Sequence, residues 1–491
     1  MPQTNNTKQA AWVALGSLCS FGFAIVSSMI LSRYFNKADY GTYKQVMYVY
    51  STLFTIFTLG LPKAFSYFLP RVELTQSKSL IRKITNLFFL LGGVFSLSLF
   101  IFAPQIANFL KNPDLTKALR VFAIVPFLML PTMGLEGILA TFKQTKFIAL
   151  YNILTNIFKL LCVALPVMIW DLGYVEALWG FVISSFVTFL LALYLKYYPV
   201  RNQPNEKCPI TLKDIFRFSI PLLTASLWGI IIASCDQFFV SRYFGNETFA
   251  EFSNGWLPLP FVGMITGATA TVLSPIFSRM SHEKVDPMKV IYPLWKSVFE
   301  KSAKLIYPIV IYCMVFADIV MSVMYGLQYA VSGSYFRIKL ITEFFNIIVF
   351  APLIINIGEV KYYSRVHMVV AISVVILEFL SVKTIFSPYA ISWVSTACQL
   401  GKIFALLWLV AKFFGIKIYQ LFPIKLILQI LIPSTALLLL ERWILIDLFQ
   451  LNTILVLVIS FVAYVALFFI YSLLMKMDYI GNIKPLISKK Q

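Results

Sequence analysis

The sequence alternates between apolar runs of roughly 20 residues and short polar stretches, and this pattern continues along the whole chain. An α-helix of about 20 residues is long enough to cross a hydrocarbon layer of about 30 Å. Lipid offers no hydrogen bonds to the backbone, so a segment that spans it must be a helix or part of a closed barrel. Barrel strands need only about 9–11 residues of alternating polarity. The pattern therefore predicts an all-α integral membrane protein.

About 14 membrane-spanning helices are expected. Their approximate ranges are 10–32, 46–69, 84–109, 119–142, 148–170, 175–197, 218–240, 252–277, 302–323, 335–356, 367–386, 389–414, 424–446 and 451–475. The first run exceeds the apolar core of a signal peptide and no clear cleavage site follows it, so it is interpreted as an uncleaved span. The connecting loops are too short to hold a soluble domain.

The net charge of +20 lies mainly in the loops between the predicted spans. One side of the membrane receives roughly three times as many Lys and Arg residues as the other, and basic loops stay in the cytoplasm. The bias predicts that both termini are cytoplasmic. Because topology accounts for the charge, no nucleic-acid partner is expected.

The chain shows no sign of catalytic or metal chemistry. Its six cysteines form no CxxC pair, and the two histidines are far apart in sequence. GxSxG, P-loop and HExxH motifs are absent. We therefore expect a protein without a cofactor that is not an enzyme. Without an ATP site, the energy for any transport would come from an ion gradient, the membrane potential or substrate flow, and the sequence leaves these open.

An internal repeat joins the two halves of the chain. The tetrapeptide Ser-Arg-Tyr-Phe ends the first predicted span at 32–35 and the seventh at 241–244. At the same offset, Tyr40 and Tyr43 align with Phe249 and Phe252. An even number of spans lies between the copies, so the repeat is parallel, with a pseudo-two-fold axis along the membrane normal. This arrangement is typical of a rocking transporter with a central cavity.

The repeat predicts three parts. Residues 1–200 form an N-terminal six-helix lobe and residues 201–415 a C-terminal six-helix lobe. Residues 416–491 add two extra C-terminal helices and a cytoplasmic tail.

Several motifs in both halves resemble Wzx-type polysaccharide and O-antigen flippases of the multidrug/oligosaccharidyl-lipid/polysaccharide (MOP) exporter superfamily. They are SSMILSRYF (27–35), DYGTY (39–43), LGLP (59–62), SIPLL (219–223), DQF (236–238), SPIFSR (274–279) and MYG (324–326). The resemblance covers roughly the first 350 residues, and beyond them only the number of spans agrees. The second copy of the family's Gly-x-Tyr element departs from the pattern, with Ala250 and Phe252.

The resemblance implies a protein of a prokaryotic cytoplasmic membrane that flips a polyprenyl-pyrophosphate-linked oligosaccharide to the outer leaflet. Transport would proceed by alternating access through a cationic central cavity. It would feed O-antigen, capsule or a related surface glycan. Membrane lipids, and other membrane proteins of polysaccharide assembly, are the expected partners.

Two predicted spans carry a polar stripe that suits such a cavity, because polar groups inside a membrane are costly and usually face an interior path. Asn152, Asn156 and Lys159 follow i, i+4, i+7 spacing on one helix face. Gln399 and Lys402 form a similar stripe in the twelfth span. Each stripe is either a cavity wall that binds sugar and phosphate or a hydrogen-bonded seam between helices.

Charged residues in three other spans have two interpretations each. Lys339 and Glu343 are spaced i, i+4 and can neutralise each other, which leaves Arg337 as the freer cation; alternatively this region is interfacial. Asp236, which lies in one of the family motifs, and Glu378 could bind a coupling cation or pair with a lysine. An ordinary interhelical hydrogen bond would explain them as well.

Four further cations are candidates for substrate binding. Arg33, Arg242 and Lys44 lie near the expected outer mouth, where they would flank the exit or simply anchor the helices at the interface. Lys63 follows Gly60-Leu61-Pro62, where a broken helix is expected. It is either a cavity cation or a cytoplasmic lysine of the usual kind.

Two alternative functions remain open. A cation-coupled multidrug antiporter of the same superfamily would need acids in its cavity, whereas the candidate lining here is mainly Lys and Arg. A membrane polysaccharide polymerase or ligase would need an extended outer loop, and the chain has none of that length.

Overall fold

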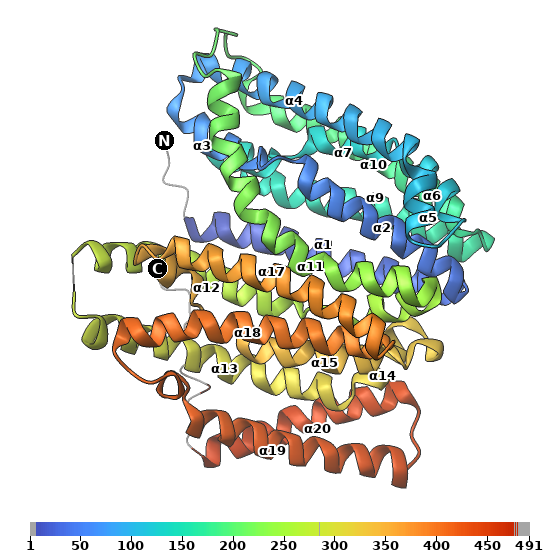
Figure 1. Cartoon of the computed structure of the whole chain (residues 1–491), viewed down its shortest axis with the longest axis vertical. Helices are drawn as coiled ribbons and strands as arrows, with labels where there is room; N and C mark the ends of the chain where they lie inside the picture. The colour runs from blue at the N-terminus through green and yellow to red at the C-terminus, as the bar shows by residue number, and fades with distance from the viewer. Residues whose placement is uncertain (1–5, 284, 476, 478, 480–491) are drawn as a thin grey trace. The chain divides into compact units, whose positions relative to one another are not determined.

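A computed structural model describes residues 6–283, 285–475, 477 and 479 of the chain. Every regular element within these ranges is a helix, which confirms the all-α fold class (Figure 1). The first five residues and most of the predicted cytoplasmic tail lie outside the described residues. By internal packing, the chain divides into two compact units, Met1–Glu251 and Phe252–Gln491.

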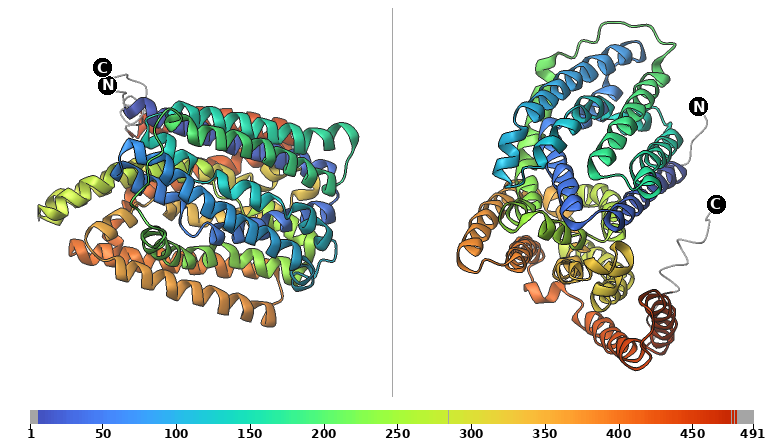
Figure 2. Two further views of the ribbon diagram at one scale, coloured as in Figure 1. Left: turned by 90° about the horizontal axis from the view of Figure 1, so that it is seen from above. Right: turned by 90° about the vertical axis from the view of Figure 1, so that its right-hand side faces the viewer.

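The first unit combines long helices with short ones that break the predicted spans. Its helices are α1 (Asn6–Tyr34), α2 (Lys37–Phe57), α3 (Pro62–Phe68), α4 (Leu74–Ile101), α5 (Ala103–Phe109), α6 (Leu115–Phe122), α7 (Val125–Met129), α8 (Leu135–Thr141), α9 (Thr145–Trp170), α10 (Tyr174–Tyr197) and most of α11 (Leu212–Gly255). α9 packs against both α1 and α10, and α4 packs against α7. Figure 2 shows these helices from two further directions.

The expected break in the second span lies between α2 and α3. Leu59 and Gly60 both have positive φ, 48° and 69°. Glycine adopts this conformation without steric cost, and Pro62 can begin α3 because the first residues of a helix need no N–H partner. The sequence therefore specifies both the end of one helix and the start of the next.

The second unit contains the remaining helices. They are α12 (Pro260–His282), α13 (Tyr292–Val315), α14 (Ala317–Tyr325), α15 (Ser332–Asn346), α16 (Ala351–Asn356), α17 (Val360–Thr384), α18 (Pro388–Phe414), α19 (Ile424–Arg442) and α20 (Thr453–Leu474). α17 packs against α18, and α15 lies between α13 and α18. The two C-terminal helices, α19 and α20, contact each other, and α19 also packs against α13 (Figure 1).

A bend of 78° separates the segments before and after Phe316. Phe316 itself has φ −99° and ψ 20°, which lies outside the helical range. α14 therefore starts afresh at Ala317, with Asp318 in its first turn. An acidic side chain in the first turn of a helix is stabilised by the positive end of the helix dipole.

Ten helical segments in the described part of the chain are long and apolar enough to cross a membrane, or twelve if each of two bent pairs forms one span. Twelve of the predicted spans have a counterpart in that set. The other two, 252–277 and 335–356, correspond to α12 and to α15 with α16. The total of 14 spans stays a prediction.

Both copies of the repeated tetrapeptide lie where a helix ends or is interrupted. α1 ends at Tyr34, and α11 is interrupted at Gly245, whose φ is 83°. The predicted domain boundaries at 200 and 415 stay a prediction. They rest on the sequence repeat, whereas the two compact units are defined by packing within each unit.

Candidate functional site

A cavity of about 200 Å³ lies among four helices of the first unit. α1, α2, α9 and α10 supply its walls, and none of its lining residues is acidic. Three predicted residues meet in it: Asn156 and Lys159 from the polar stripe of α9, and Lys44, which the sequence predicted separately. Lys44 and Lys159 come from helices far apart in sequence, so only the fold brings their charges together.

The two lysines are held by different kinds of contact. Lys44 Nζ donates a hydrogen bond to Ser28 Oγ at 3.0 Å. Lys159 Nζ lies 3.8 Å from the centroid of the Phe181 ring, a cation–π contact that orients an ammonium group without neutralising it. Among the described residues, no carboxylate lies within ion-pair distance of either lysine. The cavity therefore presents two positive charges to whatever enters it.

Both asparagines of the stripe on α9 bond to a neighbouring helix, and one of them also lines the cavity. Asn156 lines the cavity, and its Nδ2 also donates to Ser20 Oγ of α1 at 3.1 Å. Asn152 is not among the lining residues, and its Nδ2 donates to Glu136 Oε1 of α8 at 3.2 Å. One face of α9 thus contributes to the cavity wall and to the seams with its neighbours.

Three other candidate cations of the first unit do not line this cavity. Arg33 is exposed near the end of α1, and Lys63 is exposed at the start of α3. Arg242 donates to the carbonyl oxygen of Phe109, and its guanidinium carbon lies 4.6 Å from the centroid of the same ring. These contacts tie α11 to α5. The substrate-binding role of the three residues stays a prediction.

Five candidate residues of the second unit lie on α15 and α18. Lys402 interacts electrostatically with Lys339, and Lys339 interacts in turn with Glu343, as their spacing predicts. Gln399 Nε2 donates to Ser395 Oγ at 3.3 Å, a contact within α18 itself. Two lysines from different helices therefore approach each other here as well, with one acid close by.

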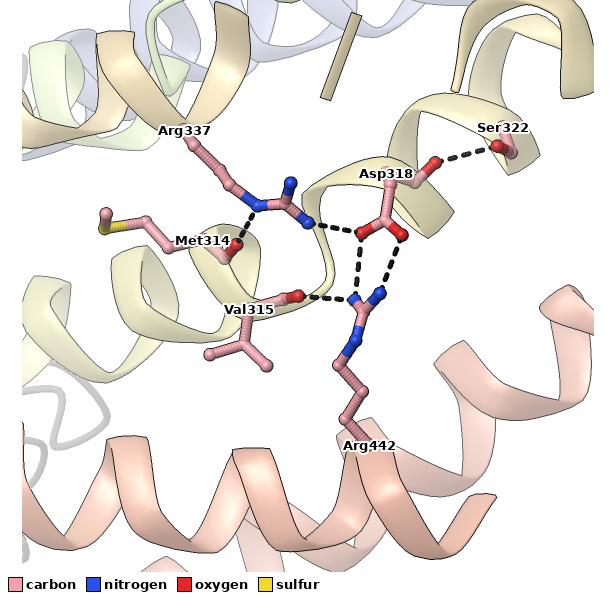
Figure 3. Close-up of polar contacts among 6 residues, drawn as sticks. All are labelled: Met314, Val315, Asp318, Ser322, Arg337 and Arg442. Carbon is pink, nitrogen blue, oxygen red and sulfur yellow. Dashed lines mark hydrogen bonds and ion pairs between the residues drawn. The ribbon is translucent and has the colours of Figure 1, made fainter. Parts of the chain in front are cut away.

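Arg337 is not the freer cation that its spacing from Glu343 predicted, and that expectation was wrong. Its Nη2 donates to Asp318 Oδ1 at 2.6 Å, and its Nε donates to the carbonyl oxygen of Met314 at 3.0 Å. Arg442 binds the same carboxylate from α19, at 2.9 Å to Oδ1 and 2.8 Å to Oδ2 (Figure 3). The prediction considered only neighbours on one helix, whereas the partner lies across the bend before α14.

Sequence reasoning missed Asp318 and Arg442 altogether. Both are charged residues inside predicted spans, 302–323 and 424–446, and that position is the signal that could have identified them. Their opposite signs would have suggested a pair. The sequence does not indicate that Arg337 binds the same carboxylate, because the three residues lie on three different helices.

The two candidate coupling acids are deeply buried. Asp236 on α11 is 1% exposed, and one of its carboxylate oxygens accepts a hydrogen bond from the backbone N–H of Gln237 at 2.8 Å. Glu378 on α17 is fully buried and interacts electrostatically with Cys398 of α18. Neither contact assigns a coupling role, which stays a prediction.

Residues 30–333 match a family described as polysaccharide biosynthesis protein. The succinoglycan biosynthesis transport protein ExoT of Rhizobium meliloti (strain 1021) is 21% identical over 281 residues, which are 57% of this chain and 55% of that protein. The alignment thus spans about half the length of this relative.

Solved structures show the same fold at low sequence identity. The lipid II flippase MurJ in an inward closed conformation aligns with a TM-score of 0.72 at 16% identity, over 95% of this chain and 99% of that chain. An inward-facing MATE family multidrug resistance transporter aligns with a TM-score of 0.64 at 14% identity, over 81% and 95%. A MOP superfamily transporter from Pyrococcus furiosus reaches 0.58 at 15% identity, over 83% and 95%.

The family match extends over more than half of the chain. The fold aligns with that of MurJ along nearly the whole length. The long apolar helices fit a multi-pass membrane protein. This chain therefore belongs to the polysaccharide biosynthesis protein family, and it has the fold of MOP superfamily transporters of known structure.

Proposed function

We propose that the protein flips a lipid-pyrophosphate-linked oligosaccharide from the cytoplasmic to the outer leaflet of the cytoplasmic membrane. Alternating access moves the headgroup across, and the product feeds surface polysaccharide synthesis. The observation that carries the proposal is the pair of lysines, Lys44 and Lys159, in one cavity whose lining contains no acid.

The electrostatics of the cavity favour an anionic ligand. A phosphate group that enters the membrane loses its hydration, and fixed positive charges replace that lost solvation. Lysine is a common phosphate-binding residue, which acts as a compact point charge with three donors. Ser27, Ser28 and Asn156 add neutral groups that can hydrogen-bond phosphate or sugar oxygens.

The size of the cavity limits what it holds at one time. About 200 Å³ is smaller than a typical site for a drug-sized ligand. In the proposed mechanism this cavity binds the phosphate end of the substrate. The oligosaccharide and the polyprenyl chain lie outside it, and a more open state of the transporter admits them.

Topology and partners complete the proposal. The excess of basic residues in one set of loops supports cytoplasmic positions for both termini. Other membrane proteins of polysaccharide assembly would supply the lipid-linked substrate and take up the flipped product.

A multidrug antiporter is the second candidate, because MATE transporters share the fold. It would bind organic cations, which two unpaired lysines in the cavity would repel. Reconstituted vesicles separate the two functions. An antiporter takes up a fluorescent organic cation in exchange for a coupling cation that moves down its own gradient. A flippase shows no such uptake.

The decisive experiment counts lipid-linked oligosaccharide on each leaflet of the cytoplasmic membrane after loss of the protein. The proposal expects accumulation on the cytoplasmic leaflet. An unchanged distribution between leaflets would refute it.

Variants test the site once flipping is measured. Replacing Lys44 and Lys159 together by Gln removes both charges, and we expect at least a tenfold loss of flipping at equal expression. Lys117→Gln, which changes an exposed lysine on α6 of the same unit, is the matched control. Full activity in the double variant would exclude this cavity as the phosphate site.

A further inference from the structure

Glu441 is a buried carboxyl group that the proposed transport cycle does not use. It lies on α19, inside the apolar segment Ile424–Leu448, with an exposed fraction of 7%. The buried residues of α19 are Ile430, Ser434, Leu438 and Glu441. Their spacing of three and four residues places them on one face of the helix, and α19 packs against α13 and α20. Glu441 therefore faces protein and not lipid.

Two tyrosine hydroxyl groups on the helices that pack against this face donate to other acceptors. Tyr312 of α13 donates to the carbonyl oxygen of Leu457 at 2.9 Å. Tyr464 of α20 donates to Ser434 Oγ, also at 2.9 Å. A tyrosine hydroxyl has a single proton to donate. Within the described part of the chain, neither carboxyl oxygen of Glu441 has a hydrogen-bond partner.

The nearby cations are also engaged elsewhere. Arg442, the next residue on α19, directs its guanidinium to Asp318 and to the carbonyl oxygen of Val315 (Figure 3). Arg337 of α15 binds the same Asp318. Among the described residues, Tyr312 of α13 and Tyr464 of α20 interact electrostatically with Glu441, and both are neutral groups. Other ionisable groups of this region include Cys313 beside Tyr312, Asp447 beside Arg442, and Tyr471, which donates to the carbonyl oxygen of Gln429. Glu441 is thus next to an arginine whose guanidinium group is bound to a different acid.

We propose that Glu441 is a proton-binding site and that its carboxyl group carries a proton in the arrangement described here. A buried carboxylate with neither a donor nor a cation is strongly disfavoured relative to the neutral acid. Carboxyl groups inside membrane spans commonly serve as proton sites in pumps and transporters. Proton uptake forms one O–H bond on the carboxyl group and removes its charge. Release returns the proton to water and leaves a carboxylate.

Release of the proton requires a change around α19. The carboxylate becomes stable only where water reaches it or where a cation such as Arg442 leaves its present partner. The protonation state of Glu441 would then be linked to the position of α19 against α13 and α14. This inference concerns the second unit alone and does not depend on the substrate of the transporter.

Infrared spectroscopy of the purified protein tests the assignment directly. A protonated carboxyl group has a carbonyl stretching band that an ionised carboxylate lacks. In the difference between wild type and Glu441→Gln at neutral pH, we expect loss of one protonated-carboxyl band, which shifts in heavy water. Buried acids that both proteins share cancel in the difference.

Glu283→Gln is the matched control, because Glu283 is exposed and paired with Arg279. Its difference spectrum should show loss of carboxylate bands. The same carboxylate signature for Glu441→Gln would overturn the proposal. If that variant does not fold, Glu441→Asp replaces it, and the protonated band must then change in position. No change in that band would be an equally clear refutation. Either negative result would refute the proton site alone, because the proposed flipping function is tested by a separate assay.

Discussion

Asp318 joins three helices through one carboxylate, and replacing it by Asn should destabilise the second unit. The side chain accepts three hydrogen bonds from the two guanidinium groups of Arg337 and Arg442. Asn keeps the size and one acceptor oxygen but removes the charge. Two arginines would then lie beside each other without the anion that both of them bind.

The magnitude follows from the exposure of the cluster. A charge-assisted hydrogen bond contributes about 1.5–3 kcal/mol when it is well shielded, and an exposed ion pair contributes only about 0–1 kcal/mol. The side chains of Arg337, Asp318 and Arg442 are 38%, 32% and 29% exposed, between these limits. We therefore expect Asp318→Asn to lower the free energy of unfolding by roughly 2–3 kcal/mol.

Thermal unfolding in detergent, followed by tryptophan fluorescence, measures the loss. For a chain of this size a loss of 2–3 kcal/mol corresponds to a fall in Tm of roughly 2–5 °C. The matched control is Glu283→Gln, which breaks an exposed pair with a closest distance of 3.9 Å and should change Tm by about 1 °C or less. Combining Asp318→Asn with Arg442→Gln should cost less than the sum of the two single changes.

Two outcomes would contradict this reasoning. If Asp318→Asn melts at the same temperature as the Glu283→Gln control, the cluster does not stabilise the fold. If the double variant shows strictly additive losses, Asp318 and Arg442 do not interact in solution. In either case α19 would be held mainly by apolar packing against α13.

Two further changes test the packing of the first unit by the same melting assay. Gly41→Ala would place a Cβ 2.0 Å from the carbonyl oxygen of Asn246, so α2 and α11 must separate, at a cost of about 1–3 kcal/mol. Gly93→Ala in α4 meets no atom within 4 Å and should not destabilise the protein, because alanine is the better helix former; equal effects would refute the close contact. Lys196 is buried and donates to the carbonyl oxygen of Met133 at 2.6 Å, so Lys196→Met should cost about 1–3 kcal/mol. Unchanged melting would show that this carbonyl finds another donor.

Much of the helical fold was predictable, because the length of an apolar run can be read from the sequence of that segment alone. Runs of about 20 apolar residues specify helices wherever they occur, and the break before Pro62 carries its own local signal in Gly60. The bend at Phe316 has no comparable signal. It depends on how α13 and α14 pack, so the sequence predicted one uninterrupted span over 302–323.

The sequence identified single candidate residues of the site, but it did not predict which of them lie together. The cost of a charge inside a span was enough to identify Lys159, and proximity to the outer mouth identified Lys44. That the two share one cavity depends on which faces of α2 and α9 meet around α1. Helical periodicity defines the face of each helix but not its neighbour. The same limit explains why Arg337 was expected to be the freer cation, although it pairs with Asp318.

The fold alone cannot distinguish a flippase from a drug transporter, because the same bundle can surround either kind of substrate. The sign of the fixed charge on the cavity wall can distinguish them. In the first unit the buried acid Asp236 is not among the lining residues, whereas two lysines are. Reversing one charge, as in Lys159→Glu, is therefore a sharper test than removing it. We expect flipping to fall below that of Lys159→Gln, because the new carboxylate repels a phosphate. Equal activity of the Glu and Gln variants would mean that no anion approaches this wall.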